Sequence, residues 1–87
     1  MPSQTDKAMI WQEHTREEIN AFPRDEAVAV LPIGSLEQHG LHLPVDTDSR
    51  TATYVAREAA LAAGVPTLVL PIIPYGLSIH HMPHGGT

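Results

Sequence analysis

The side chains that could carry out chemistry gather in one stretch of fifteen residues, 34–48, which reads GSLEQHGLHLPVDTD. The stretch contains one Glu, two His and two Asp, and it follows directly on an apolar run, 27–33, that is typical of a buried strand. Carboxylate oxygens and imidazole nitrogens are the ligands that zinc and related divalent ions take in proteins. The sequence therefore favours a divalent metal site at the end of a strand, and metal-assisted chemistry over a generic binding role.

Within this stretch, the spacing singles out Glu37, His39 and Asp48 as candidate metal ligands. Glu37 and His39 are two residues apart, so in extended backbone both side chains project the same way. Gly40 then permits a sharp bend or a positive φ. Asp48 stands at the predicted start of a helix, where the spacing allows two roles, a metal ligand or only a helix N-cap. Asp46 is expected to be solvated or turn-forming rather than a ligand.

A second group of imidazoles, His80, His81 and His84, follows a second apolar run, 67–73. Ligands of open α/β sheets bind beyond the carboxyl ends of the strands. The two polar loops should therefore share one cleft if the two predicted strands are parallel neighbours. His80 and His81 are adjacent and would face opposite ways in an extended segment, so at most one of them should reach the site easily.

The elements around these loops predict an α/β fold containing a βαβ unit of a parallel sheet. Strand 27–33 leads through the long loop to a helix from Asp48 or Ser49 to about Ala63, and strand 67–73 follows. Five alanines and Val55 recur in the helix at the spacing of one packed face, and a Gly-x-Pro sequence at 64–66 ends it. Both strands contain the sequence VLPI, at 30–33 and 69–72, which predicts equivalent positions on neighbouring strands.

The rest of the chain is expected to add little regular structure. Residues 1–9 are expected to be loose, and everything after Pro74 is expected to be loop. Thr15 and Glu18 fit a capping box that starts a short helix stopped by Pro23. The predicted organisation is an N-terminal segment, 1–26, and an incomplete α/β domain, 27–87. Two strands alone would leave both sheet edges bare, which favours the N-terminal portion of a larger enzyme. The alternative is a chain that folds only within an oligomer.

Composition excludes several classes of protein. Ten acidic against five basic side chains give a formal charge of −5, which argues against a nucleic-acid partner. The absence of Cys excludes disulfides and thiolate zinc sites. No secretory signal or basic membrane-binding helix is recognisable, and the longest apolar runs of about seven residues are too short to span a bilayer. A soluble cytoplasmic protein without a membrane partner is predicted.

The motif EQHGxHLP at 37–44, followed by Thr47-Asp48, resembles the creatininase (creatinine amidohydrolase) family. The preceding LPIGS at 31–35 is similar to the family as well. So is PYGLS at 74–78, followed by His81 and Gly86-Thr87. The resemblance covers roughly residues 27 to 87.

This resemblance implies a site with two divalent metal ions, usually zinc or manganese. Carried over by motif, Glu37 would bind one metal and His39 the other, and the Asp48 carboxylate would bridge them. His42 would stand in or near the second shell. Ser78 and His81 would line the substrate side.

The sequence also departs from the family. Further ligands are expected in a later Asn-Gly-His motif and a further acidic residue, and this chain ends before either. The second motif usually reads Ser-x-Glu-His-x-x-Phe-Pro-Gly-Thr. Here its Glu, Phe and Pro positions hold His80, His84 and Gly85, which leaves the shape of the second loop and the roles of both imidazoles open.

The expected function is hydrolysis of a cyclic amide or a related non-peptide C–N bond by a metal-bound hydroxide, in a full-length homo-oligomer with a small-molecule amide substrate. Family members include a creatinine hydrolase, a deformylase and a peptidase, and these residues do not distinguish among their substrates. The 87-residue chain alone is expected to be inactive, because ligands are lacking. The alternative is a non-catalytic, His-rich metal-binding or interaction module. A nucleotide-binding βαβ unit is disfavoured, because residues 34–35 begin neither a G-x-G-x-x-G nor a Walker pattern.

Overall fold

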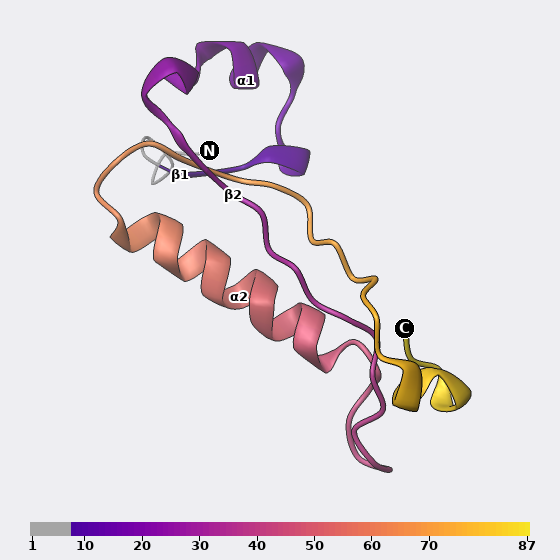
Figure 1. Ribbon diagram of the computed structural model, residues 1–87. Coiled ribbons are helices and arrows are strands. Elements are labelled where there is room, and N and C mark those ends of the chain that lie inside the picture. The colour runs from indigo at the N-terminus through magenta and orange to yellow at the C-terminus, as the bar shows by residue number, and fades with distance from the viewer. Residues whose placement is uncertain (1–7) are drawn as a thin grey trace.

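The computed structural model describes residues 8–87 and contains a three-stranded parallel sheet with helices on both sides (Figure 1). The strands are β1 (Ala8–Ile10), β2 (Val28–Val30) and β3 (Thr67–Val69), in the order β1-β3-β2. The α-helices are α1 (Arg16–Ala21) and α2 (Thr47–Ala62). Three 3₁₀ helices complete the fold: η2 (Trp11–Glu13), η3 (Arg24–Glu26) and η4 (Ile79–His84).

The predicted βαβ unit is confirmed by β2, α2 and β3. β2 and β3 are parallel neighbours, and Val30 stands opposite Val69, as the shared VLPI sequence predicts. Beyond this point the register slips by one residue, because Ile33 pairs with Ile73 rather than with residue 72. The ladders are three residues long, shorter than the predicted strands, since Pro32 and its counterpart in the other VLPI sequence have no N–H to donate.

The expectation that residues 1–9 are loose is wrong for residues 8 and 9, which belong to strand β1. Residues 1–7 lie outside the described part of the chain. Ala8 and Met9 are buried, at 4% and 5% exposure, and β1 pairs with β3 along the side opposite β2. A three-residue strand is too short to show strand periodicity, which is why the sequence did not predict it. Strand β3 is therefore central and fully buried, while β1 and β2 form the edges.

Both helices begin near their predicted positions. The capping box is confirmed, since Glu18 N donates to Thr15 Oγ1 at 3.2 Å and Thr15 N donates to Glu18 Oε1 at 2.8 Å. Helix α2 starts at Thr47 with Asp46 in the N-cap position. Asp48 therefore lies inside the first turn, and its interpretation as a helix N-cap is wrong. The segment after Pro74 is not all loop, because it contains η4.

The core consists of two small clusters, one on each face of the sheet. Ala8 and Val69 pack against Ala56 and Ala60 of α2. On the opposite face, Met9 and Leu68 pack against Phe22, which follows α1, with Ile19 beside them. Side chains of successive strand residues thus point to opposite faces of the sheet, as strand geometry requires.

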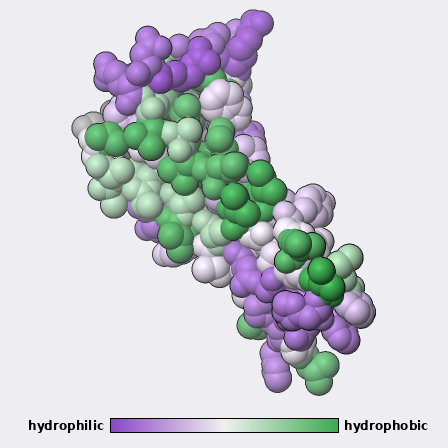
Figure 2. All heavy atoms as spheres, in the orientation of Figure 1, coloured by the Kyte–Doolittle hydropathy of each residue, from purple (hydrophilic) through white to green (hydrophobic). Residues whose placement is uncertain are grey.

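The molecule is elongated, with extents of 45 × 20 × 18 Å, because two loops project from one edge of the sheet (Figure 1). A band of apolar side chains crosses its middle (Figure 2). Val28, Leu31 and Ile33, from β2 and the segment after it, are 53%, 46% and 63% exposed. Within residues 8–87, neither α2 nor any shorter helix has the length and apolar character needed to cross a membrane.

Candidate functional site

The site forms where the segments after β2 and β3 run side by side beyond the carboxyl edge of the sheet (Figure 1). The backbone pair Ile33–Ile73 joins them, with Gly34 N donating to Ile73 O at 2.9 Å. Farther out, η4 contacts the residues around Glu37. The prediction that the two polar loops open on the same edge is confirmed, and it follows from the parallel pairing of β2 and β3.

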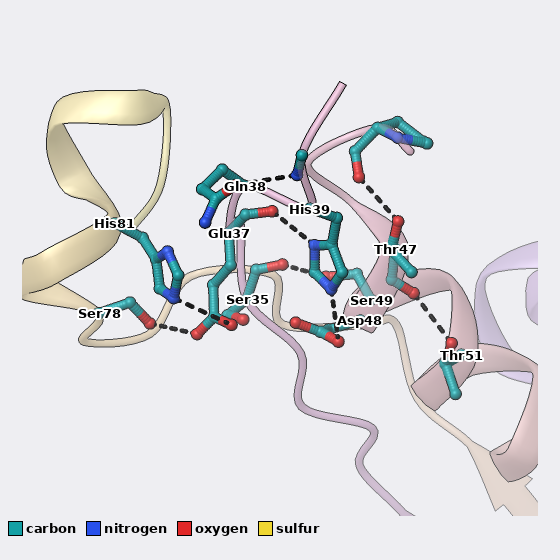
Figure 3. A network of polar contacts seen from close by, with 12 residues as sticks. Ser35, Glu37, Gln38, His39, Thr47, Asp48, Ser49, Thr51, Ser78 and His81 are labelled. Carbon is teal, nitrogen blue, oxygen red and sulfur yellow. Dashed lines mark hydrogen bonds and ion pairs between the residues drawn. The ribbon is translucent and has the colours of Figure 1, made fainter. Parts of the chain in front are cut away.

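Glu37 faces the second loop. Ser78 Oγ donates a hydrogen bond to Glu37 Oε2 at 2.5 Å, and His81 Nε2 lies 3.9 Å from Glu37 Oε1 (Figure 3). The hydrogen bond from Ser78 is the largest influence on the Glu37 carboxyl and lowers its pKa, against an opposing effect of burial; Ser35 and His81 lower it further. Glu37 is therefore ionised at neutral pH.

His39 is held in one tautomer. Its Nδ1 lies 2.9 Å from the backbone oxygen of Glu37, and its Nε2 lies 3.5 Å from Oδ1 of Asp48 (Figure 3). A carbonyl oxygen only accepts hydrogen bonds, so Nδ1 must carry the proton. In the neutral ring, Nε2 then presents a lone pair to a carboxylate, which is also an acceptor. Two facing acceptors repel each other unless a cation, either a proton or a metal ion, lies between them.

Close packing of the first loop on α2 places Asp48 beside His39. The buried Ser49 Oγ donates to Ser35 O at 3.1 Å. A Cβ at Gly34 would lie 2.4 Å from Ser49 Oγ and 2.6 Å from Ser49 Cα. Only glycine permits this approach of the loop to the first turn of the helix.

The donor set fits a divalent ion in part. Zinc–nitrogen and zinc–oxygen bonds of about 2.0–2.2 Å put two tetrahedral ligands about 3.4 Å apart, close to the separation of His39 Nε2 and Asp48 Oδ1. A backbone carbonyl on Nδ1 is one of the usual partners of a metal-binding imidazole. However, no group of three or more His, Cys, Asp or Glu within residues 8–87 is gathered closely enough to hold a metal. The structure brings His39 to Asp48 and Glu37 to Ser78 and His81, as two adjacent sets.

The other histidines are more exposed. No hydrogen bond or ion pair among residues 8–87 joins the exposed His42 to the other candidate residues. His80 is also exposed and stacks obliquely on His81, with ring centroids 4.0 Å apart. His84 lines a pocket of about 550 Å³ together with His39 and five other residues between 38 and 45. The imidazole at the family's usual Phe position thus opens on the same pocket as a candidate ligand.

Sequence reasoning missed two residues that organise the site. Ser35 lowers the pKa of Glu37, and Thr87 joins the two loops. Thr87 Oγ1 accepts hydrogen bonds from Leu36 N at 3.3 Å and from Gly76 N at 3.1 Å. Both residues occur in the strings that resemble the creatininase family, but a hydroxyl side chain in a loop carries no periodicity from which a contact could be predicted.

A family model and two groups of relatives match this chain. The family model described as creatinine amidohydrolase matches residues 12–87. The mycofactocin precursor peptide peptidase of Mycobacterium tuberculosis is 44% identical over 74 residues, covering 76% of this chain and 30% of the relative. The corresponding peptidase of Mycolicibacterium smegmatis is 42% identical over 64 residues, which cover 69% of this chain and 26% of the relative.

A second group of relatives is named for a different activity. The 2-amino-5-formylamino-6-ribosylaminopyrimidin-4(3H)-one 5'-monophosphate deformylase of Methanothermobacter thermautotrophicus is 55% identical over 38 residues, covering 42% of this chain and 16% of the relative. The chain thus spans less than a third of the length of these relatives. The family match extends over nearly all of the described residues and includes both loops of the site. This chain belongs to the creatininase family.

Proposed function

We propose that the chain contributes the first part of the metal site of a hydrolase that cleaves an amide-type C–N bond. The observation that carries the proposal is the contact between His39 Nε2 and Asp48 Oδ1, with Nδ1 of the same ring engaged by the Glu37 carbonyl. An imidazole fixed in this tautomer and facing a carboxylate is a prepared pair of ligands for a divalent cation. The two ions expected from the family, zinc or manganese, would use Glu37, His39 and Asp48 from this chain.

The remaining site residues support this role. When bound, divalent ions would supply Lewis-acid activation of water and of a carbonyl group. Ser78 donates to Glu37 and lowers the pKa of its carboxyl, which favours the carboxylate form that binds a metal ion. His81 Nε2 lies 3.9 Å from the other carboxylate oxygen, Glu37 Oε1. From this position its imidazole would exchange a proton with a bound substrate.

The pocket beside His39 supports a substrate of modest size. Its volume of about 550 Å³ lies within the usual range for small-molecule sites, and its walls mix apolar side chains with His39 and His84. The names of the relatives specify a peptide and a formamide, both of which contain an amide-type C–N bond. We therefore propose this bond class; a cyclic amide, and the restriction to non-peptide bonds, remain predictions. The cytoplasmic location and the homo-oligomer also remain predictions.

Titration of the full chain with Zn²⁺ or Mn²⁺ tests the proposal, and His39→Gln is the informative variant. We expect saturable binding to weaken by more than about 100-fold, since a ligand is lost. His14→Gln is the matched control, because His14 also has its Nδ1 on a backbone carbonyl, that of Ile10 at 2.8 Å, and forms no ion pair within the described residues. Equal affinities for both variants would refute the metal site. The non-catalytic alternative predicts metal binding without hydrolysis, even in a longer protein that also contains the Asn-Gly-His motif and the further acidic ligand expected from the family.

A further inference from the structure

Thr87 connects the backbones on both sides of the Ser78–Glu37 hydrogen bond. On the Glu37 side, Thr87 Oγ1 accepts from Leu36 N at 3.3 Å, and Thr87 N donates to Leu36 O at 2.7 Å. On the Ser78 side, Ser78 N donates to Thr87 O. The same hydroxyl also accepts from Gly76 N at 3.1 Å. One residue therefore fixes the two segments whose side chains meet at the candidate metal ligand.

The approach of Thr87 to Leu36 depends on the glycine before it. A Cβ at Gly86 would lie 2.6 Å from Leu36 O and 2.7 Å from both Cβ and O of His81. Gly85, with φ of +86°, turns the chain at the end of η4 and donates to Met82 O at 3.3 Å. The turn brings the chain from η4 back against the first loop. The contact of Thr87 with Leu36 therefore depends on the two glycines before Thr87.

We propose that Thr87 is a positioning residue for the metal site: by fixing the backbone on both sides of the Ser78–Glu37 contact, it holds the Glu37 carboxylate in the orientation needed for metal binding. The inference rests on the proposed function, because it assumes that Glu37 is a ligand. Thr87 itself donates no ligand in this scheme. Thr87 acts on Glu37 through the backbone of Leu36. A change at Thr87 should therefore alter how tightly the metal ion binds, and not which metal ion is preferred.

Three variants of the full chain test the proposal. Thr87→Val removes the hydroxyl at nearly constant volume, and Thr87→Ser retains it. Thr67→Val is the matched control, because the Thr67 hydroxyl likewise bonds to the backbone, donating to Val65 O at 2.9 Å at the start of β3. Zn²⁺ affinity is measured by competition with a chelator. Amide hydrogen exchange at Leu36 and Gly76 is measured by NMR in the metal-free protein.

We expect Thr87→Val to weaken Zn²⁺ binding by about 10–100-fold, the usual effect of losing a residue that orients a ligand. Exchange at Leu36 and Gly76 should accelerate in the same variant. Thr87→Ser should bind Zn²⁺ like the wild type, and so should Thr67→Val even if its thermal stability falls. Unchanged Zn²⁺ affinity in Thr87→Val would overturn the inference, whether or not exchange accelerates. Failure of the proposed function would be seen separately, as absence of specific Zn²⁺ binding in the wild type.

Discussion

The imidazole of His39 and the carboxylate of Asp48 face each other at 3.5 Å across the junction between a loop and the first turn of α2. Since Nδ1 of His39 is committed to the Glu37 carbonyl, the facing nitrogen has no proton of its own in the neutral ring. The pair is thus poorly satisfied without a cation. The distance between His39 Nε2 and Asp48 Oδ1 is that expected of two ligands of one metal ion. Replacement of Asp48 is therefore the most direct test of the site.

We predict that Asp48→Ala in the full chain lowers divalent-metal affinity by at least about 100-fold, because a bridging carboxylate would contribute to both ions. Metal content after dialysis, measured by elemental analysis, checks this prediction. Asp25→Ala is the control, since Asp25 lies in η3 on the polar turn before β2. A folded Asp48→Ala protein that retains the wild-type metal content would exclude the bridging role.

Replacing Ser78 with Ala should raise the pKa of Glu37 toward its ordinary value, because the Ser78 hydrogen bond is the largest cause of the lowered pKa. A lowered carboxyl pKa stabilises the folded state above the ordinary Glu pKa, and this stabilisation is lost as the pH falls through the folded-state pKa. Ser78→Ala should therefore reduce the acid dependence of unfolding. The check is a ¹³C carboxyl titration of the metal-free protein. Ser35→Ala should give a shift in the same direction but smaller, and a larger shift for Ser35 would contradict the assignment.

Local signals in the sequence predicted the elements that hold the site. The helix pattern from Asp48 or Ser49 to Ala63 predicted α2 to within two residues at its start and one at its end, and the VLPI pair predicted the Val30–Val69 register. Strand β1 escaped prediction because three residues show no period. The strand lengths were overestimated, because the apolar pattern continues past prolines that end the ladder.

Within the site, the sequence predicted which loops would meet but not how. The meeting of the Glu37 loop with Ser78 and His81 follows from parallel strands, which topology can foresee. The Leu36–Thr87 contact joins residues 51 positions apart and depends on the turn at Gly85, so no local pattern reveals it. The position of Asp48 in the helix was left open by spacing alone, and the observed start of α2 at Thr47 removed the N-cap reading.

Gly34→Ala should destabilise the protein and disturb the site together. Its Cβ would lie 2.6 Å from Ser49 Cα, a backbone atom that cannot move without shifting the first turn of α2. The expected loss in free energy of unfolding is about 1–3 kcal/mol, typical of overpacking, measured by urea denaturation. Gly76→Ala is the control, because its nearest neighbours are 3.7 Å away and neither glycine has a positive φ. We expect its effect to stay within about 1 kcal/mol; equal losses for both variants would show that the Gly34–Ser49 contact is not tight.

The capping box of α1 gives a prediction that is independent of the metal site. Thr15→Ala should reduce the free energy of unfolding by about 1 kcal/mol, because Thr15 Oγ1 accepts from Glu18 N at the helix start. In the wild type, the backbone N–H of Thr15 is the main cause of the lowered pKa of Glu18. This carboxylate therefore stabilises α1 above the ordinary Glu pKa and ceases to do so as the pH falls through its folded-state pKa. An NMR titration should show the Thr15 amide proton moving with the Glu18 carboxyl resonance.

Thr51→Ala is the matched control for this helix-cap prediction. Thr51 lies inside α2, where its hydroxyl bonds to Thr47 O at 3.0 Å and where Ala is the better helix former. Its replacement should leave the stability unchanged or raise it slightly, while Thr15→Ala lowers it. If both variants changed the free energy of unfolding in the same direction, the effect of Thr15→Ala would not come from the N-cap position of Thr15. A Thr15 amide resonance that did not follow the Glu18 titration would show that the second hydrogen bond of the box is absent in solution.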